Sequence, residues 1–402
     1  MLFCEAANRL FNDRYHRAST SKRLARGCQD AEVALLLALT PHIQDVHIDA
    51  PSDPNNDYRQ NEVPTFLQDI VLQKRTAPNP ALTRFANLER ISLAGWKESN
   101  TNHMILSTFF KLPSLITFQA HSVGGFREAL WDSLPGTSTV PHITLEGCSM
   151  DTNQIGIMIN SCAVLRTFEF RKWDKDYRDQ MRARCTWRQI GEALYPHKLH
   201  LERLTLESSK AHDYLGPGRF VEAQTFGEGG LREFTALRHL RCSQAVLLGT
   251  GRSFPPSQFR QRFRTIKQDL VGVLPSSLMS LDISRCNADI KPQLKRLLAS
   301  KEQHLPSLYT LIFGTVSMDA EQMDWSLPDE EEEFTEHMKS YCFSQNVRVV
   351  RINDKRQRYR RDDSWPRETP YSCGMLLSRL SQLEDSPCLR VEGIYEPFHV
   401  YM

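Results

Sequence analysis

One segment, from Val140 to Phe168, contains a complete structural repeat and constrains the fold more than any other part of the chain. Apolar and polar residues alternate over Val140–Leu145, which is typical of a short, half-buried strand. Apolar residues then follow at the three- and four-residue spacings of one helix face: Ile155, Met158, Ile159 and Cys162. The strand pattern restarts at Leu165, 25 residues after Val140. This order predicts a stack of strand-plus-helix units.

The strand motif, with apolar residues at its positions 1, 4 and 6, recurs along the chain. It begins at Ile43, Leu88, Leu115, Val140, Leu165, Leu201, Leu237, Leu278, Leu308 and Val347. Between Leu88 and Leu165 the successive spacings are 27, 25 and 25 residues. Helix-period segments lie between strands, at residues 104–110, 155–162, 190–194 and 294–298. A strand and a helix per period of about 20 to 29 residues predict an α/β leucine-rich-repeat solenoid, a horseshoe with a parallel concave sheet and outer helices.

Three parts are expected along the chain. Residues 1–30 form an N-terminal segment, residues 31–355 a solenoid of about ten irregular repeats, and residues 356–402 a tail or a cap on the last repeat. A buried helix is expected at Ala31–Leu39. Pro- and Gly-rich stretches and one acidic run indicate loops and loop insertions: residues 51–64, 208–233, 249–264 and 329–333.

Composition excludes several classes of protein. The formal net charge is only +2, so no overall basic field favours nucleic acid or a membrane surface. The ten cysteines include no C-x-x-C pair, and Cys148, Cys162 and Cys286 fall at repeat positions where a thiol packs in a core. The longest apolar run, Val33–Leu39, is too short to cross a bilayer, and the start is unlike a signal peptide. We therefore expect a cytoplasmic or nuclear protein.

The repeat at Val140–Leu165, with its Gly147-Cys148 turn and closing Cys162, resembles the cysteine-containing class of leucine-rich repeats. The irregular spacing and the Leu-rich segment before the first strand resemble fungal F-box/leucine-rich-repeat proteins. That resemblance implies a substrate-recognition subunit of a Skp–cullin–RING ubiquitin ligase. The opening Leu-Pro-x-Glu motif of an F-box is not found, although residues 3–12 resemble the segment that follows such a box. An adaptor would then have its F-box upstream of this sequence.

Side chains at strand positions 3, 5 and 7 define the inner, concave face of the predicted sheet, which we call the open face. Solenoids bind partners on such extended surfaces. The mixed charges of this face favour a protein ligand. The predicted partner-binding residues are His142, Glu146, Glu169, Arg171, Arg203, Glu207, His239 and Arg241. Reversing the charges of Arg171, Arg203 and Arg241 together is expected to leave the fold intact and to abolish partner binding.

Two other kinds of site were weighed. Asp45, His47 and Asp49 share one strand face at a spacing compatible with a metal ion, which would suit a metal-dependent enzyme. The basic stretch at residues 348–361 would suit a localisation signal or a nucleic-acid contact, but a solvated segment is the simpler interpretation.

No catalytic motif and no phosphate-binding glycine motif is found. We therefore predict a non-enzymatic protein without a cofactor or metal. Its expected partner is a protein substrate held on the open face, together with Skp and cullin subunits if an F-box exists. The alternative is a stand-alone leucine-rich-repeat scaffold without a ligase.

Overall fold

The computed structural model describes the parts of the chain that form the repeats. These are residues 42–49, 87–95, 104–125, 131–172, 186–208, 230–248, 269–286, 290–315, 347–353, 388–391 and 400–401, with the positions 18, 21–22, 25, 40, 128 and 226. They belong to two compact units, which we treat separately. Unit 1 comprises Met1–Val164 and Glu368–Met402, and unit 2 comprises Leu165–Arg367.

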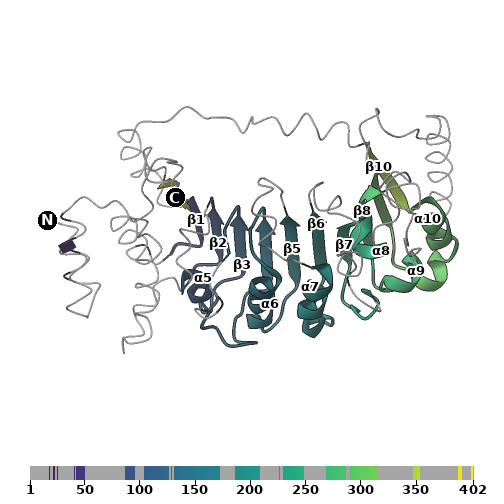
Figure 1. The fold of residues 1–402 in the computed structure, drawn as a ribbon. Coiled ribbons are helices and arrows are strands. Elements are labelled where there is room, and N and C mark those ends of the chain that lie inside the picture. Colours follow the sequence, from purple (N-terminus) through teal and green to yellow (C-terminus); the bar gives the residue numbers. More distant parts are fainter. Residues whose placement is uncertain are drawn as a thin grey trace, which may run out of the picture. The chain divides into compact units, whose positions relative to one another are not determined.

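Unit 1 contains a sheet whose first four strands are parallel and follow the order of the chain (Figure 1). These strands are β1 (Asp45–Asp49), β2 (Arg90–Ala94), β3 (Thr117–His121) and β4 (His142–Glu146). Two helices, α5 (Met104–Phe109) and α6 (Thr152–Ser161), lie on the same side of this sheet. Two C-terminal strands extend the sheet at β1: β11 (Cys388–Val391) pairs in parallel with β1, and β12 (Val400–Tyr401) pairs antiparallel with β11.

Unit 2 contains six parallel strands, also in chain order. They are β5 (Thr167–Lys172), β6 (Arg203–Ser208), β7 (His239–Ser243), β8 (Ser280–Cys286), β9 (Thr310–Thr315) and β10 (Arg348–Asn353). The intervening helices are α7 (Trp187–Leu194), the short 3₁₀ helix η4 (Tyr195–His197), α8 (Gln244–Leu248), α9 (Leu270–Val273), α10 (Ile290–Ala299) and α11 (Lys301–His304).

The apolar strand positions form the core of each unit. In unit 2, Phe168 of β5 is in register with Leu204 of β6, which is in register with Leu240 of β7. The ladder continues through Leu281 and Leu311, and all five side chains are buried. Each such side chain contributes about 1.5 to 3 kcal/mol when it leaves water. Because every ladder residue packs against the neighbouring repeats, the stability of one repeat depends on those beside it.

The start of α6 in unit 1 is fixed by a capping box. The Asp151 carboxylate accepts a hydrogen bond from the Gln154 backbone N–H at 2.8 Å, and the Gln154 side chain accepts one from the Asp151 N–H at 2.9 Å. This reciprocal pair satisfies two N–H groups that would otherwise lack partners. The helix then places Ile155, Met158 and Ile159 in the core.

The predicted strand–helix pattern is confirmed. All ten predicted strands from Ile43 to Val347 are present, and helices occupy the four segments where helical spacing was found. The expected helix at Ala31–Leu39, the loop stretches and the acidic run lie wholly or mostly outside the described residues. The expected tail or cap at residues 356–402 lies mostly outside the described residues, and within it strand β11 pairs with β1.

The repeat cysteines are core residues, as expected. Cys148, Cys162, Cys242 and Cys286 are buried free thiols. Burial raises the pKa of Cys148, Cys162 and Cys286 from 9.0 to about 12, because the thiolate loses its hydration.

We therefore expect these three thiols to resist alkylation in the native protein. At pH 8 a thiol with a pKa of about 12 carries roughly a thousandth of the thiolate of one at 9.0, so iodoacetamide should label it on the order of a thousandfold more slowly. Peptide mass spectrometry at successive times measures the rates, and guanidinium-unfolded protein is the control. Equal rates in native and unfolded protein would contradict the burial.

Candidate functional site

The open face of unit 2 is organised by the strand register into rungs that run across the strands. The first rung is neutral or basic, and the second and third contain most of the charges. From β5 to β9 the rungs are Thr167–Arg203–His239–Ser280–Thr310 and Glu169–Thr205–Arg241–Asp282–Ile312, and Arg171 faces Glu207 on the third. Five of these charged residues form a connected set, which we call the charge ladder: Glu169, Arg171, Glu207, Arg241 and Asp282.

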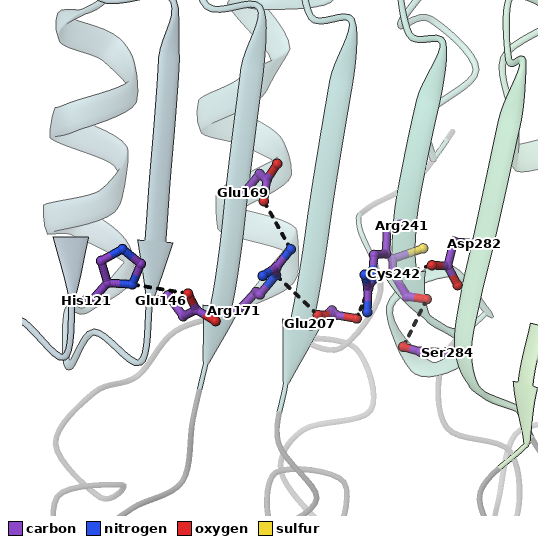
Figure 2. Close-up of polar contacts among 9 residues, drawn as sticks. All are labelled: His121, Glu146, Glu169, Arg171, Glu207, Arg241, Cys242, Asp282 and Ser284. Atoms are coloured by element: carbon purple, nitrogen blue, oxygen red, sulfur yellow. Dashed lines mark hydrogen bonds and ion pairs between the residues drawn. The ribbon is translucent and has the colours of Figure 1, made fainter. Parts of the chain in front are cut away.

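Ion pairs connect the charge ladder across four strands (Figure 2). On β5, Arg171 Nη2 donates to Glu169 Oε2 at 3.2 Å, and Arg171 Nε lies 3.4 Å from Glu207 Oε2 on β6. Arg241 of β7 donates from Nε to Glu207 Oε1 at 2.7 Å. The same Arg241 Nε lies 3.5 Å from Asp282 Oδ2 on β8. Glu207 therefore bridges two guanidinium groups, and Arg241 bridges two carboxylates.

The surroundings of the charge ladder favour the charged form of Arg241 and disfavour the charged form of Asp282. Burial disfavours the charge of Arg241, but Glu207 and Asp282 more than offset it and raise the pKa of this guanidinium. Burial raises the pKa of Asp282, Arg241 opposes the shift, and Glu207 adds to it. With three carboxylates and two guanidiniums, the formal net charge of the set is −1. The pairs are only partly exposed, so solvent and salt screen them less than ordinary surface pairs.

Arg203 and His239 lie on the first rung, outside the charge ladder. Burial, followed by the positive charges of Arg203 and Arg238, lowers the pKa of His239 from 6.5. His239 is therefore mostly neutral at pH 7. Arg203 is exposed, so the cation of this rung is accessible to a partner.

The remaining predicted residues, His142 and Glu146, lie on the open face of unit 1. Glu146 pairs with His121 of β3, whose Nδ1 lies 3.1 Å from Glu146 Oε2 (Figure 2). His142 is on a different rung, in register with Thr117. The eight predicted residues thus divide between the units, and four of them (Glu169, Arg171, Glu207 and Arg241) are joined by the ion pairs described above.

The metal alternative rested on Asp45, His47 and Asp49 of β1. Asp45 forms an ion pair with Arg90 of the neighbouring strand β2, and Arg90 Nη2 donates to Asp45 Oδ2 at 2.8 Å. The Asp49 side chain is outside the described part of the structure. Among the residues that the structure describes, no group of three or more His, Cys, Asp or Glu side chains could hold a metal ion.

Sequence reasoning left Asp282 and His121 out of the predicted site. Both are open-face residues, at positions 5 and 7 of their repeats. Asp282 forms an ion pair with Arg241, and His121 Nδ1 lies 3.1 Å from Glu146 Oε2. The available signal was charge complementarity between equal positions of consecutive repeats. Arg241 and Asp282 share position 5 of β7 and β8, and His121 and Glu146 share position 7 of β3 and β4.

Comparison with models of protein families identifies the family of the chain. A family model described as a leucine-rich repeat domain matches residues 5–326, which is most of the chain. No curated protein matches the chain, and neither does any solved structure. The match and the parallel strand–helix repeats together confirm the predicted α/β leucine-rich-repeat fold. In the described part of the chain, no helix has the length and apolar character needed to cross a membrane.

Proposed function

The chain belongs to the leucine-rich repeat family, and we propose that it binds a protein partner through the open face of unit 2. Domains of this family are protein-interaction modules and are typically not enzymes. The proposed mechanism is therefore recruitment, in which the face selects a partner and no bond is made or broken.

The charge ladder is the observation that carries this proposal. Its charges alternate in sign over four neighbouring strands and are held by mutual ion pairs at 2.7 to 3.5 Å. Charges fixed on a sheet before binding cost little ordering entropy when a partner docks. A partner with the complementary arrangement of charges is therefore expected to bind more tightly than other proteins, because like charges brought together on docking cost free energy.

Neutral substitutions test this surface better than the charge reversals that the sequence suggested. Reversing Arg171 and Arg241 would add two carboxylates to Glu169, Glu207 and Asp282, and that repulsion would disturb the fold itself. The triple variant Arg171→Gln, Arg203→Gln, Arg241→Gln removes the charges and keeps shorter, polar side chains that can still form hydrogen bonds.

We expect this triple variant to recover the main partner at least about tenfold less well than the wild type in affinity purification, because charged interface anchors contribute about 1.4 kcal/mol or more. The matched control is Arg166→Gln, Arg188→Gln, Arg296→Gln, three exposed arginines of unit 2 outside the open face. Circular dichroism checks that both variants fold. Unchanged recovery by the open-face variant, or an equal loss in the control, would contradict the proposal.

The more specific proposal is a substrate-recognition subunit of a Skp–cullin–RING ubiquitin ligase in the cytoplasm or nucleus. It is supported by the resemblance of the Val140–Leu165 repeat to the cysteine-containing repeats of F-box proteins. The buried free cysteines also suit a reducing compartment.

Affinity purification of the tagged chain from its native cells, followed by mass spectrometry, tests this specific role. The experiment is repeated with a form extended at its N-terminus through any upstream reading frame. Recovery of Skp and cullin subunits would support the adaptor. Reproducible partners without a ligase subunit would instead support a stand-alone repeat scaffold.

A further inference from the structure

Asp282 differs from the other carboxylates of the charge ladder because none of the described residues donates a hydrogen bond to it. Glu169 accepts one from Arg171 and Glu207 accepts one from Arg241, at 3.2 and 2.7 Å. Asp282 has only the longer ion pair with Arg241 at 3.5 Å, although its side chain is just 15% exposed. A carboxylate removed from water without donors is costly, and burial accordingly raises its pKa.

The surface beside Asp282 changes from charged to apolar. On the side away from Arg241, Asp282 is in register with Ile312 of β9, which is partly exposed on the open face. Two residues further along β9 is Gly314, which has no side chain to occupy that rung. The register of β10 brings Val350 to the rung of Ile312 and Ile352 to the rung of Gly314. Ile312 therefore places apolar surface beside a carboxylate with few donors.

A second unsatisfied polar group lies on the neighbouring strand. Ser243, at position 7 of β7, follows the same alternation as Arg241 and is in register with Ser284 of β8. It is 1% exposed, and its Oγ has no hydrogen-bond partner among the described residues. The Ser284 hydroxyl instead donates to the Cys242 carbonyl oxygen at 3.5 Å (Figure 2). An unpaired buried hydroxyl is uncommon in a native fold, so Ser243 adds a second unsatisfied polar group on the strand beside Asp282.

We infer that a lysine or arginine side chain of the protein partner docks at Asp282, with its aliphatic stem on Ile312 and an apolar residue of the same segment beside it. This inference rests on the proposed function and specifies the chemistry of the partner. The cation supplies the donors that Asp282 lacks, and a charge-assisted hydrogen bond is roughly twice as strong as a neutral one. The long aliphatic stem of a basic side chain packs on apolar surface while its head reaches a charge.

Charge balance excludes the opposite kind of occupant. The charge ladder has three carboxylates and two guanidiniums, so one added cation brings its formal charge to zero. An acidic side chain at Asp282 would face that carboxylate and Glu207, the two acidic partners of Arg241. A neutral amide could donate a hydrogen bond but would leave the excess negative charge uncompensated.

The test uses the full chain and an immobilised array of short peptides. Each peptide has a central Arg, Lys, Gln or Glu followed by two apolar residues, within an uncharged Gly/Ser frame. We expect the wild-type chain to bind the Arg and Lys peptides at least about tenfold more strongly than the Gln peptides, and the Glu peptides least. In Asp282→Asn, which keeps the shape of the side chain, the preference for basic peptides should disappear. Glu192→Gln, an exposed carboxylate on α7, is the matched control and should retain the preference.

Each other outcome overturns the inference. A basic preference that persists in Asp282→Asn places the basic residue elsewhere, and selection of Gln or Glu peptides by the wild type assigns the wrong chemistry. Absence of binding to every peptide also counts against it. The proposed function is judged separately, by whether the open-face arginine variant loses the cellular partner. If the open-face arginine variant loses the cellular partner but Asp282→Asn does not change the peptide preference, the proposed function stands and only this inference is rejected.

Discussion

Leu204→Asp is expected to unfold unit 2 around β6 under conditions in which the wild type is fully folded. Leu204 is 0% exposed and lies between Phe168 and Leu240 in the buried ladder. A carboxylate there has no room for water, and it would either stay charged without a partner or become protonated at a cost. Together with the lost apolar burial, we expect a loss of about 4 to 5 kcal/mol or more. Most domains have only about 5 to 15 kcal/mol of stability in total.

Urea unfolding followed by circular dichroism measures this effect. Leu199→Asp is the matched control, because it makes the same substitution in the turn before β6, where the side chain is 61% exposed. The control should change the free energy of unfolding by no more than about 0.5 kcal/mol. Similar midpoints for the two variants would show that the buried ladder is not the source of stability in unit 2.

The repeats were predictable because the strand motif determines burial directly. Side chains alternate across a strand, so apolar positions 4 and 6 must share one face, and a shift of one residue would expose them all. Phe168 and Phe170 of β5 illustrate this, since both are fully buried while Glu169 between them is not. The capping box of Asp151 and Gln154, which the motif did not indicate, fixes the start of α6 three residues before the first apolar helix position.

The charge ladder could be predicted only in part, because its contacts join residues far apart in the chain. Arg241 pairs with Glu207, which is 34 residues earlier and on a different rung, so equal motif positions do not indicate this contact. From the sequence, Arg171 and Arg241 are predicted as partner-binding residues, and the sequence does not indicate their contacts with carboxylates of the same face. In the structure, both arginines pair with carboxylates, and Asp282 is the charge-ladder carboxylate to which no described residue donates a hydrogen bond.

The C-terminal pairing was beyond prediction for a similar reason. The residues of β11, Cys388–Val391, begin no repeat of recognisable spacing, and the strand pairs with β1 more than 300 residues earlier. Short strands such as β11 and β12 have little periodicity of their own, so a local pattern could not indicate which edge they join.

Helices α8, α9 and α11 are likewise only four or five residues long, which is too short for a helical period to be visible.

Gly230→Ala is expected to destabilise unit 2 by about 3 kcal/mol, for two reasons that act together. The backbone of Gly230 has φ +56°, a left-handed conformation that costs a residue with a Cβ about 1 to 2 kcal/mol. A Cβ here would also lie 2.7 Å from the Val273 Cβ and 3.1 Å from its Cα. The segment cannot easily move away, because the Leu231 N–H donates to the Val273 carbonyl at 2.8 Å. Overpacking of this kind typically costs about 1 to 3 kcal/mol.

The same substitution at Gly272 separates these causes from a general effect of replacing glycine. Gly272 lies in α9, next to Val273, but a Cβ there would meet nothing within 4 Å and its φ is not in the left-handed range. Alanine is the better helix former, so Gly272→Ala should leave stability unchanged or raise it by up to about 1 kcal/mol. Thermal and urea unfolding of both variants measures the difference. If Gly230→Ala were as stable as Gly272→Ala, the close contact between the Gly230 turn and α9 would be wrong, because a fixed turn against that helix leaves no space for a methyl group.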